Sequence, residues 1–99
     1  MSNLIYKDAI CEFYVRVESF GLSLHVRYNH TPDKRIIRHT EKIFDELCIS
    51  LLDKGFKSLY TTVEDYVQYR YAQHFGFEDQ ELIVEDDNGI EYQVMKVDL

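Results

Sequence analysis

The 99-residue sequence has only two cysteines and one proline, and its eleven basic residues are outnumbered by eighteen acidic ones. Cys11 and Cys48 are too few for a disulfide framework, so we expect both to be buried free thiols. No apolar run approaches the roughly 20 residues that span a bilayer, which excludes a membrane-spanning helix. The net charge of −7 would repel the phosphate backbone, which argues against a general nucleic-acid binder.

The rest of the composition is typical of a single small globular domain over residues 1–99. Hydrophobic residues make up 45% of the chain and charged residues 29%, as in ordinary folded proteins. Residues 1–8 lack the basic-then-apolar layout of a signal peptide, so the sequence predicts a cytoplasmic location. Basic side chains are concentrated in residues 34–42, whereas residues 78–91 carry only acidic charge. Such a charge distribution suits an anionic ligand at one end of the domain and a basic partner at the other.

Short segments rich in β-forming residues predict five strands. Apolar residues alternate over 11–18 and over 22–28, and a tight reversal at 19–21 predicts an antiparallel hairpin. Residues 59–63 form a third β-prone segment. Two further segments, 81–85 and 90–97, flank an Asn-Gly pair that favours a hairpin turn.

Two amphipathic segments, 32–54 and 65–75, predict helices. Thr31 supplies a capping hydroxyl before the first helix, and Gly55 stands where a left-handed residue ends it. Gly76 ends the second helix in the same way. Together the elements predict an α+β fold with a ββαβαββ mixed sheet packed by two helices. The passage from 22–28 through a helix to 59–63 predicts a parallel crossover, with 90–97 placed between 59–63 and 81–85.

This order of elements, with a second helix that stops at Phe75-Gly76-Phe77, resembles the C-terminal part of the GNAT acetyltransferase fold. The resemblance covers about residues 8–99, so the chain is expected to be a single truncated GNAT-like domain. Small phage-encoded proteins with GNAT-like folds are the most similar, because their second helix ends in a run comparable to Arg70-Tyr71-Ala72. The resemblance implies that acetyl-CoA would lie between a splayed pair of parallel strands.

The start of the first helix departs from the pattern of that family. Family members keep a glycine-rich loop there, whose backbone amides hold the pyrophosphate, whereas residues 29–35 contain no glycine. The positive end of the helix and its basic side chains remain as an anion site. The resemblance therefore implies that any acetyl-CoA would be bound by Thr31, Lys34, Arg35 and Arg38.

The position of the general acid also departs from the family. Its usual acid is a tyrosine four residues before the glycine, and this chain has Ala72 there. Tyr71 and Tyr69 are the neighbouring phenols, so they are the candidate catalytic acids. Glu12, Glu18 and His25 are candidate bases for an amine substrate, although their strand positions face outward.

Both departures favour a binding role over catalysis. The first hypothesis is a catalytically silent phage protein that acts as a virion-structural or host-interaction module, in the host cytoplasm or in the virion. The alternative is an acyl-CoA-dependent N-acetyltransferase with a degenerate cofactor loop. We predict no metal site, because the histidines and cysteines lack the usual ligand spacings. We also predict a protein partner or self-association through strand 11–18, which we expect at a sheet edge with Tyr14 and Arg16 available.

Overall fold

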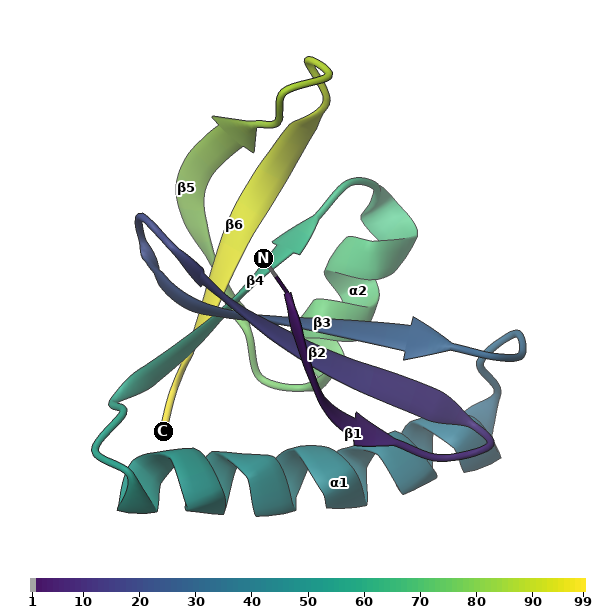
Figure 1. Ribbon diagram of the computed structural model, residues 1–99. Helices are drawn as coiled ribbons and strands as arrows, with labels where there is room; N and C mark the ends of the chain where they lie inside the picture. The colour runs from purple at the N-terminus through teal and green to yellow at the C-terminus, as the bar shows by residue number, and fades with distance from the viewer. Residues whose placement is uncertain (1) are drawn as a thin grey trace.

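The computed structural model describes residues 2–99, which form one mixed sheet and two helices (Figure 1). Among these residues, neither helix combines the length and the apolar composition that crossing a bilayer requires. In chain order the elements are β1 (Asn3–Lys7), β2 (Cys11–Glu18), β3 (Gly21–Tyr28), α1 (Lys34–Asp53), β4 (Ser58–Val63), α2 (Tyr66–His74), β5 (Glu78–Glu85) and β6 (Glu91–Asp98).

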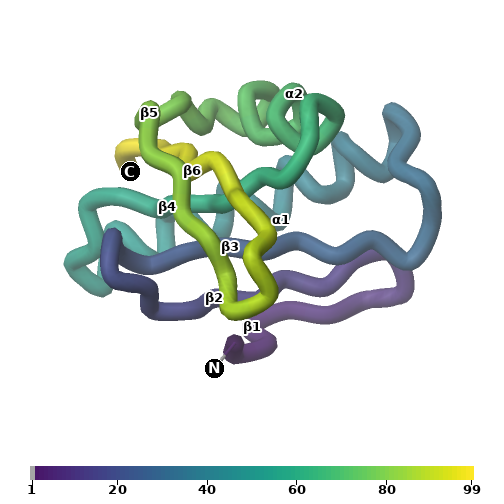
Figure 2. Tube along the Cα trace, turned by 90° about the horizontal axis from the view of Figure 1, so that it is seen from above, coloured from purple at the N-terminus to yellow at the C-terminus, as the bar shows by residue number. Residues whose placement is uncertain are grey.

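The six strands lie in the order β1-β2-β3-β4-β6-β5. β3 and β4 are parallel, and the other neighbours are antiparallel. Figure 2 shows β1, β2 and β3 running side by side. The expected parallel crossover and the expected place of the last strand, between β4 and β5, are confirmed.

The predicted GNAT-like ββαβαββ layout is wrong, because a sixth strand precedes the hairpin and gives the order βββαβαββ. This strand, β1, was missed for a physical reason. Its side chains are mostly exposed, and its register to β2 shifts between Leu4 and Tyr6, so it has no clean alternation of apolar and polar residues. Edge strands of this kind carry a weak sequence signal because packing constrains only part of one face.

The presence of β1 also changes which strands lie at the edges of the sheet. Strand 11–18, the expected site of association, is internal: Tyr14 pairs with Leu4 on one side and with His25 on the other. The described edges are β1 and β5. The prediction that association would use strand 11–18 as a free edge is therefore wrong.

Local signals in the sequence explain where the helices begin and end. The carboxylate of Asp33 accepts hydrogen bonds from the amides of Arg35 and Ile36, so Asp33, and not Thr31, is the capping residue of α1. Gly55 follows the end of α1 with a φ of +94°, a left-handed conformation that favours glycine. The expected glycine at the end of this helix is confirmed.

The core lies where the sheet meets both helices. Phe13, Leu59 and Met95 are fully buried on three different strands. The ring of Phe44 from α1 lies 5.4 Å from the ring of Phe75 and 5.7 Å from that of Phe77, measured between centroids. These aromatic contacts join α1 to the end of α2 and position both helices beside the gap between β3 and β4.

Candidate functional site

The parallel strands β3 and β4 touch over a very short stretch. Their one paired position is Ser23 with Tyr60, and the hydroxyl of Thr61 donates a hydrogen bond of 2.9 Å to the carbonyl of Leu24. Figure 1 shows β4 crossing β3 at a steep angle, so the strands separate beyond this point. The separation leaves a space in the sheet that side chains from both helices border.

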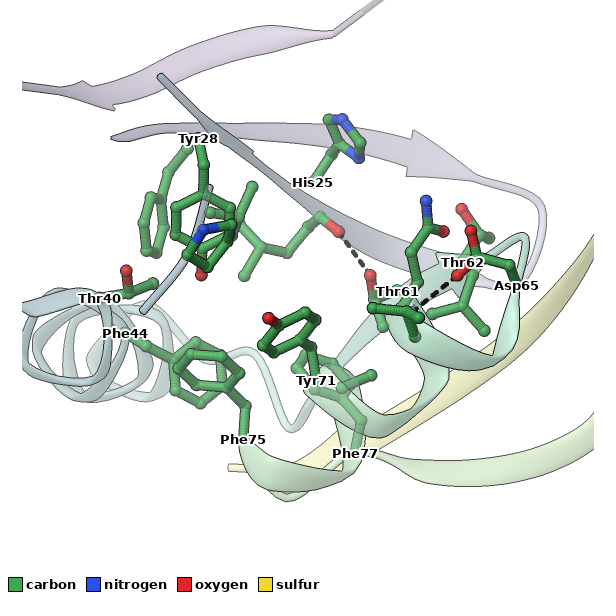
Figure 3. A pocket seen from close by; sticks show the side chains of 18 residues that line it. His25, Tyr28, Thr40, Phe44, Thr61, Thr62, Asp65, Tyr71, Phe75 and Phe77 are labelled. Atoms are coloured by element: carbon green, nitrogen blue, oxygen red, sulfur yellow. Dashed lines mark hydrogen bonds between the residues drawn. The ribbon is translucent and has the colours of Figure 1, made fainter. Parts of the chain in front are cut away.

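This space is a pocket of about 410 Å³, which we call the β3–β4 pocket (Figure 3). Its lining is mainly apolar and aromatic, with a few hydroxyl groups among the apolar side chains. The lining residues are Phe13, Leu24, His25, Val26, Tyr28, Pro32, Thr40, Phe44, Thr61, Thr62, Val63, Asp65, Val67, Gln68, Tyr71, Ala72, Phe75 and Phe77. A concave apolar site with a few polar groups is the usual form of a ligand pocket.

Two tyrosines are among the polar residues that line the β3–β4 pocket. Tyr71 points into it from α2, and Tyr28 borders it from β3 (Figure 3). Burial raises the pKa of Tyr28 above its ordinary value, while a hydrogen bond with Thr40 acts in the opposite direction. Tyr28 is therefore a neutral hydrogen-bonding group at physiological pH.

A second cavity of about 800 Å³, the α1–α2 groove, runs between the two helices. Lys34 and Arg38 line it from α1, and Arg70 lines it from α2. Pro32, Val67 and Tyr71 belong to the lining of both cavities, so the groove adjoins the β3–β4 pocket. Its full lining is Pro32, Asp33, Lys34, Ile37, Arg38, Glu41, Tyr66, Val67, Arg70, Tyr71 and His74.

Neighbouring side chains hold two of the groove residues in place. The guanidinium of Arg70 donates a hydrogen bond of 3.1 Å to the hydroxyl of Tyr66 and lies 5.9 Å from the centre of its ring. His74 pairs with Glu41 across the two helices. Within residues 2–99, neither Lys34 nor Arg38 forms a salt bridge. The ammonium of Lys34 and the guanidinium of Arg38 are therefore both available to an anion.

The structure brings together only some of the predicted cofactor-binding residues. Lys34 and Arg38 line the groove, whereas Thr31 and Arg35 line neither cavity. The carboxylate of Asp33 occupies amides at the start of α1 and places negative charge beside the helix end. A phosphate group would have to displace this carboxylate to use those amides.

The structure also places the two predicted catalytic tyrosines in different surroundings. Tyr71 lines the β3–β4 pocket, but Tyr69 points elsewhere and donates a hydrogen bond of 3.1 Å to Asp79. Desolvation and this hydrogen bond raise the pKa of Tyr69. Of the candidate bases, only His25 borders the pocket. Glu12 pairs with Lys7, and Glu18 pairs with Arg16.

A separate polar cluster lies where the turn between β1 and β2 meets α1. Oδ2 of Asp8 lies 2.5 Å from Nε2 of His39 and accepts a 2.6 Å hydrogen bond from Tyr6. Cys11 lies beside this pair and is fully buried, and burial raises the pKa of its thiol to about 11. A buried thiol with a raised pKa is a poor nucleophile.

Sequence spacing could not reveal the cluster of Asp8, Cys11 and His39, because folding brings His39 next to residues about 30 positions earlier in the chain. The same holds for the β3–β4 pocket, whose residues come from five elements. No family model matches the chain, and no curated protein matches it. The resemblance to acetyltransferases therefore stays a prediction.

Proposed function

We propose that this chain is a catalytically silent binding module for an anionic amphiphile. Its apolar part would lie in the β3–β4 pocket, and its negative group would lie in the α1–α2 groove. The observation that carries this proposal is the shared border of the two cavities, formed by Pro32, Val67 and Tyr71. An apolar pocket thus adjoins basic side chains in a chain whose net charge is −7.

A segment of a partner protein, with an apolar side chain next to acidic residues, has the required chemistry. Aromatic and apolar side chains commonly anchor such segments in pockets, while charges around the pocket select the partner. This agrees with the predicted role as a virion-structural or host-interaction module. The virion or host setting itself rests on the sequence resemblance alone.

Three features support a binding role over catalysis. Asp33 occupies helix amides that a cofactor phosphate would otherwise use. Ala72, at the position of the usual acid, is buried and has no proton to donate. Tyr28, a partly buried phenol of the pocket, has a raised pKa and no described ion pair that would activate it.

The alternative function is acyl-CoA-dependent N-acyl transfer. One observation favours it: Tyr71 points into the space between the two parallel strands, where the resemblance implies that acetyl-CoA would lie. In this case Tyr71 would supply a proton to the leaving thiolate, and Lys34 with Arg38 would hold the phosphates. The two functions differ in whether acetyl-CoA binds.

Calorimetric titration with acetyl-CoA separates these two functions. Micromolar binding that is lost in Lys34→Glu with Arg38→Glu would favour the transferase. No heat at millimolar acetyl-CoA would remove it and leave the binding module in place. Product formation from an amine and acetyl-CoA, lost in Tyr71→Phe, would contradict the catalytically silent role.

Binding of an anionic amphiphile can be tested directly with 8-anilinonaphthalene-1-sulfonate, a fluorescent probe with an apolar ring system and one sulfonate. We expect one site per chain and about tenfold weaker binding in Arg38→Glu, because repulsion replaces attraction in the groove. Lys42→Glu is the matched control, since it reverses one charge on the same helix outside both cavities.

Blocking the pocket gives a second, independent test. Val67 is 61% exposed and borders both cavities, so Val67→Trp should reduce probe binding without disturbing the core. Near-ultraviolet circular dichroism must show the native fold in each variant, because the probe also binds partly folded states. Equal binding by wild type, Arg38→Glu and Val67→Trp would contradict the proposed site.

A further inference from the structure

The cluster of Asp8, Cys11 and His39 offers three ligand types that transition metals prefer. A carboxylate oxygen, a thiol sulfur and an imidazole nitrogen all lie within 4.8 Å of one another. We propose that these three side chains bind a divalent metal ion of the Zn²⁺ class, with the fourth position taken by water. Zn²⁺ is bound by cysteine, histidine and carboxylate ligands, and sites with three protein ligands keep water in the fourth position of a tetrahedron.

Backbone contacts fix the carboxylate of Asp8 in an orientation suited to an ion. Oδ1 accepts hydrogen bonds from the amides of Ile10 at 2.7 Å and Cys11 at 2.9 Å. Oδ2 is therefore directed toward His39, and the hydroxyl of Tyr6 donates a hydrogen bond to this same oxygen. Hydrogen bonds of this kind orient metal ligands and increase metal affinity.

The ion would take the place of the proton between Asp8 and His39. Oδ2 of Asp8 and Nε2 of His39 lie 2.5 Å apart. Two ligand atoms that each lie about 2.0 Å from a tetrahedral ion are about 3.3 Å from each other. The required movement is below about 1 Å and is open to His39, whose side chain is 37% exposed. The same exposure gives the ion an entry path, although the sulfur of Cys11 is fully buried.

The protons balance in a simple way. In the neutral ring, the proton between Asp8 and His39 lies on Nε2. When the ion binds, the ring takes up its other tautomer, with its single proton on Nδ1, and Nε2 binds the ion. The thiol of Cys11 releases one proton to solvent and binds as a thiolate. Asp8 is already ionised and exchanges its hydrogen bond with His39 for a bond to the ion. One proton is therefore released for each ion bound.

Cobalt substitution tests the site, because Co²⁺ reports its ligands by absorption. The probe is CoCl₂, added under reducing conditions to tag-free protein that has been stripped of metal with EDTA. We expect visible bands typical of tetrahedral cobalt, a near-ultraviolet band of thiolate-to-cobalt charge transfer, and saturation at one ion per chain. ZnCl₂ should remove both signals by displacement.

Matched variants identify the ligands. Cys11→Ser should abolish the charge-transfer band, and His39→Gln should weaken binding by about tenfold or more. Cys48→Ser and His74→Gln should bind as the wild type does, since neither side chain belongs to the cluster. If Cys11→Ser does not fold, a Zn²⁺-dependent rise in Tm that His39→Gln loses and Cys48→Ser keeps decides the question.

Two results would overturn the site. A charge-transfer band that survives in Cys11→Ser or disappears in Cys48→Ser would place the ion at another cysteine. No cobalt band and no Zn²⁺-dependent change in Tm at millimolar metal would show that the three side chains serve only as a hydrogen-bonded connection between α1 and β2.

Discussion

The ring of Tyr60 fills the space that a side chain at position 21 would need. A Cβ atom at Gly21 would lie 2.6 Å from Cε2 of Tyr60, closer than carbon atoms approach in proteins. Tyr60 also packs edge-on against Phe20, with 5.4 Å between ring centroids. Gly21 has a φ of +139°, so both its backbone and its lack of a side chain are required where the β2–β3 turn meets β4.

We therefore predict that Gly21→Ala destabilises the protein by about 2–4 kcal/mol, through backbone strain and the clash with Tyr60. Gly55→Ala is the control, because its φ is +94° but no atom lies within 4 Å of the added carbon. Gly55→Ala should lower the free energy of unfolding by less, about 1 kcal/mol. Urea unfolding measures both. Equal losses for the two variants would show that the contact with Tyr60 contributes nothing.

The core between β4 and the helices predicts a second effect. Leu59 is fully buried, so Leu59→Ala should lower the free energy of unfolding by about 2–5 kcal/mol, from lost burial and the cavity left behind. Leu52 is 52% exposed on α1, and Leu52→Ala should cost less than about 1 kcal/mol. A loss at Leu52 that matched the loss at Leu59 would mean that α1 turns a different face toward the sheet.

A third prediction tests β1. The ring of Tyr6 packs edge-on against Phe13 with 5.9 Å between centroids, and its hydroxyl bonds to Asp8. Tyr6→Ala removes both contacts and should lower Tm more than Tyr6→Phe, which removes only the hydrogen bond. Tyr14→Ala, at a half-exposed position on β2, is the control. If Tyr6→Ala and Tyr14→Ala had the same small effect, β1 would not be packed on the domain.

Local patterns were enough to predict most of the elements. The alternation over 11–18 and 22–28, the apolar stripe of α1 and the glycines at helix ends each depend on interactions between residues close in sequence. Pairing followed from connectivity, because a strand-helix-strand passage leaves few arrangements. β1 escaped prediction because its register shift and exposed face remove the alternation that marks a strand.

The candidate sites depend on tertiary structure and were harder to predict. Lys34 and Arg38 were expected from the family resemblance and from their charge, but Asp33 acts as the cap, and its carboxylate changes what the helix end can bind. The approach of Asp8 to His39 and the separation of β3 from β4 come from how distant elements pack. No pattern along the chain encodes either of them directly.

A final prediction concerns the β5–β6 turn. A hydrogen bond from the amide of Ile90 holds the pKa of Asp86 below its ordinary value of 3.8, and bonds from Asn88 and Tyr92 act in the same direction against desolvation. The folded protein therefore keeps this carboxylate ionised at a pH where the unfolded chain takes up a proton. The resulting stabilisation is complete above pH 3.8 and is lost as the pH falls through the lowered pKa.

Asp86→Asn should accordingly lower Tm at neutral pH, and its difference from wild type should shrink in acid. Asp87→Asn is the matched control, because it removes a charge from the same turn at an exposed position. Thermal unfolding of the three proteins at pH about 7 and about 2.5 measures the effect. A difference between Asp86→Asn and wild type that stays constant across this range would contradict the lowered pKa, because a carboxylate without such hydrogen bonds has no pH-linked contribution to lose.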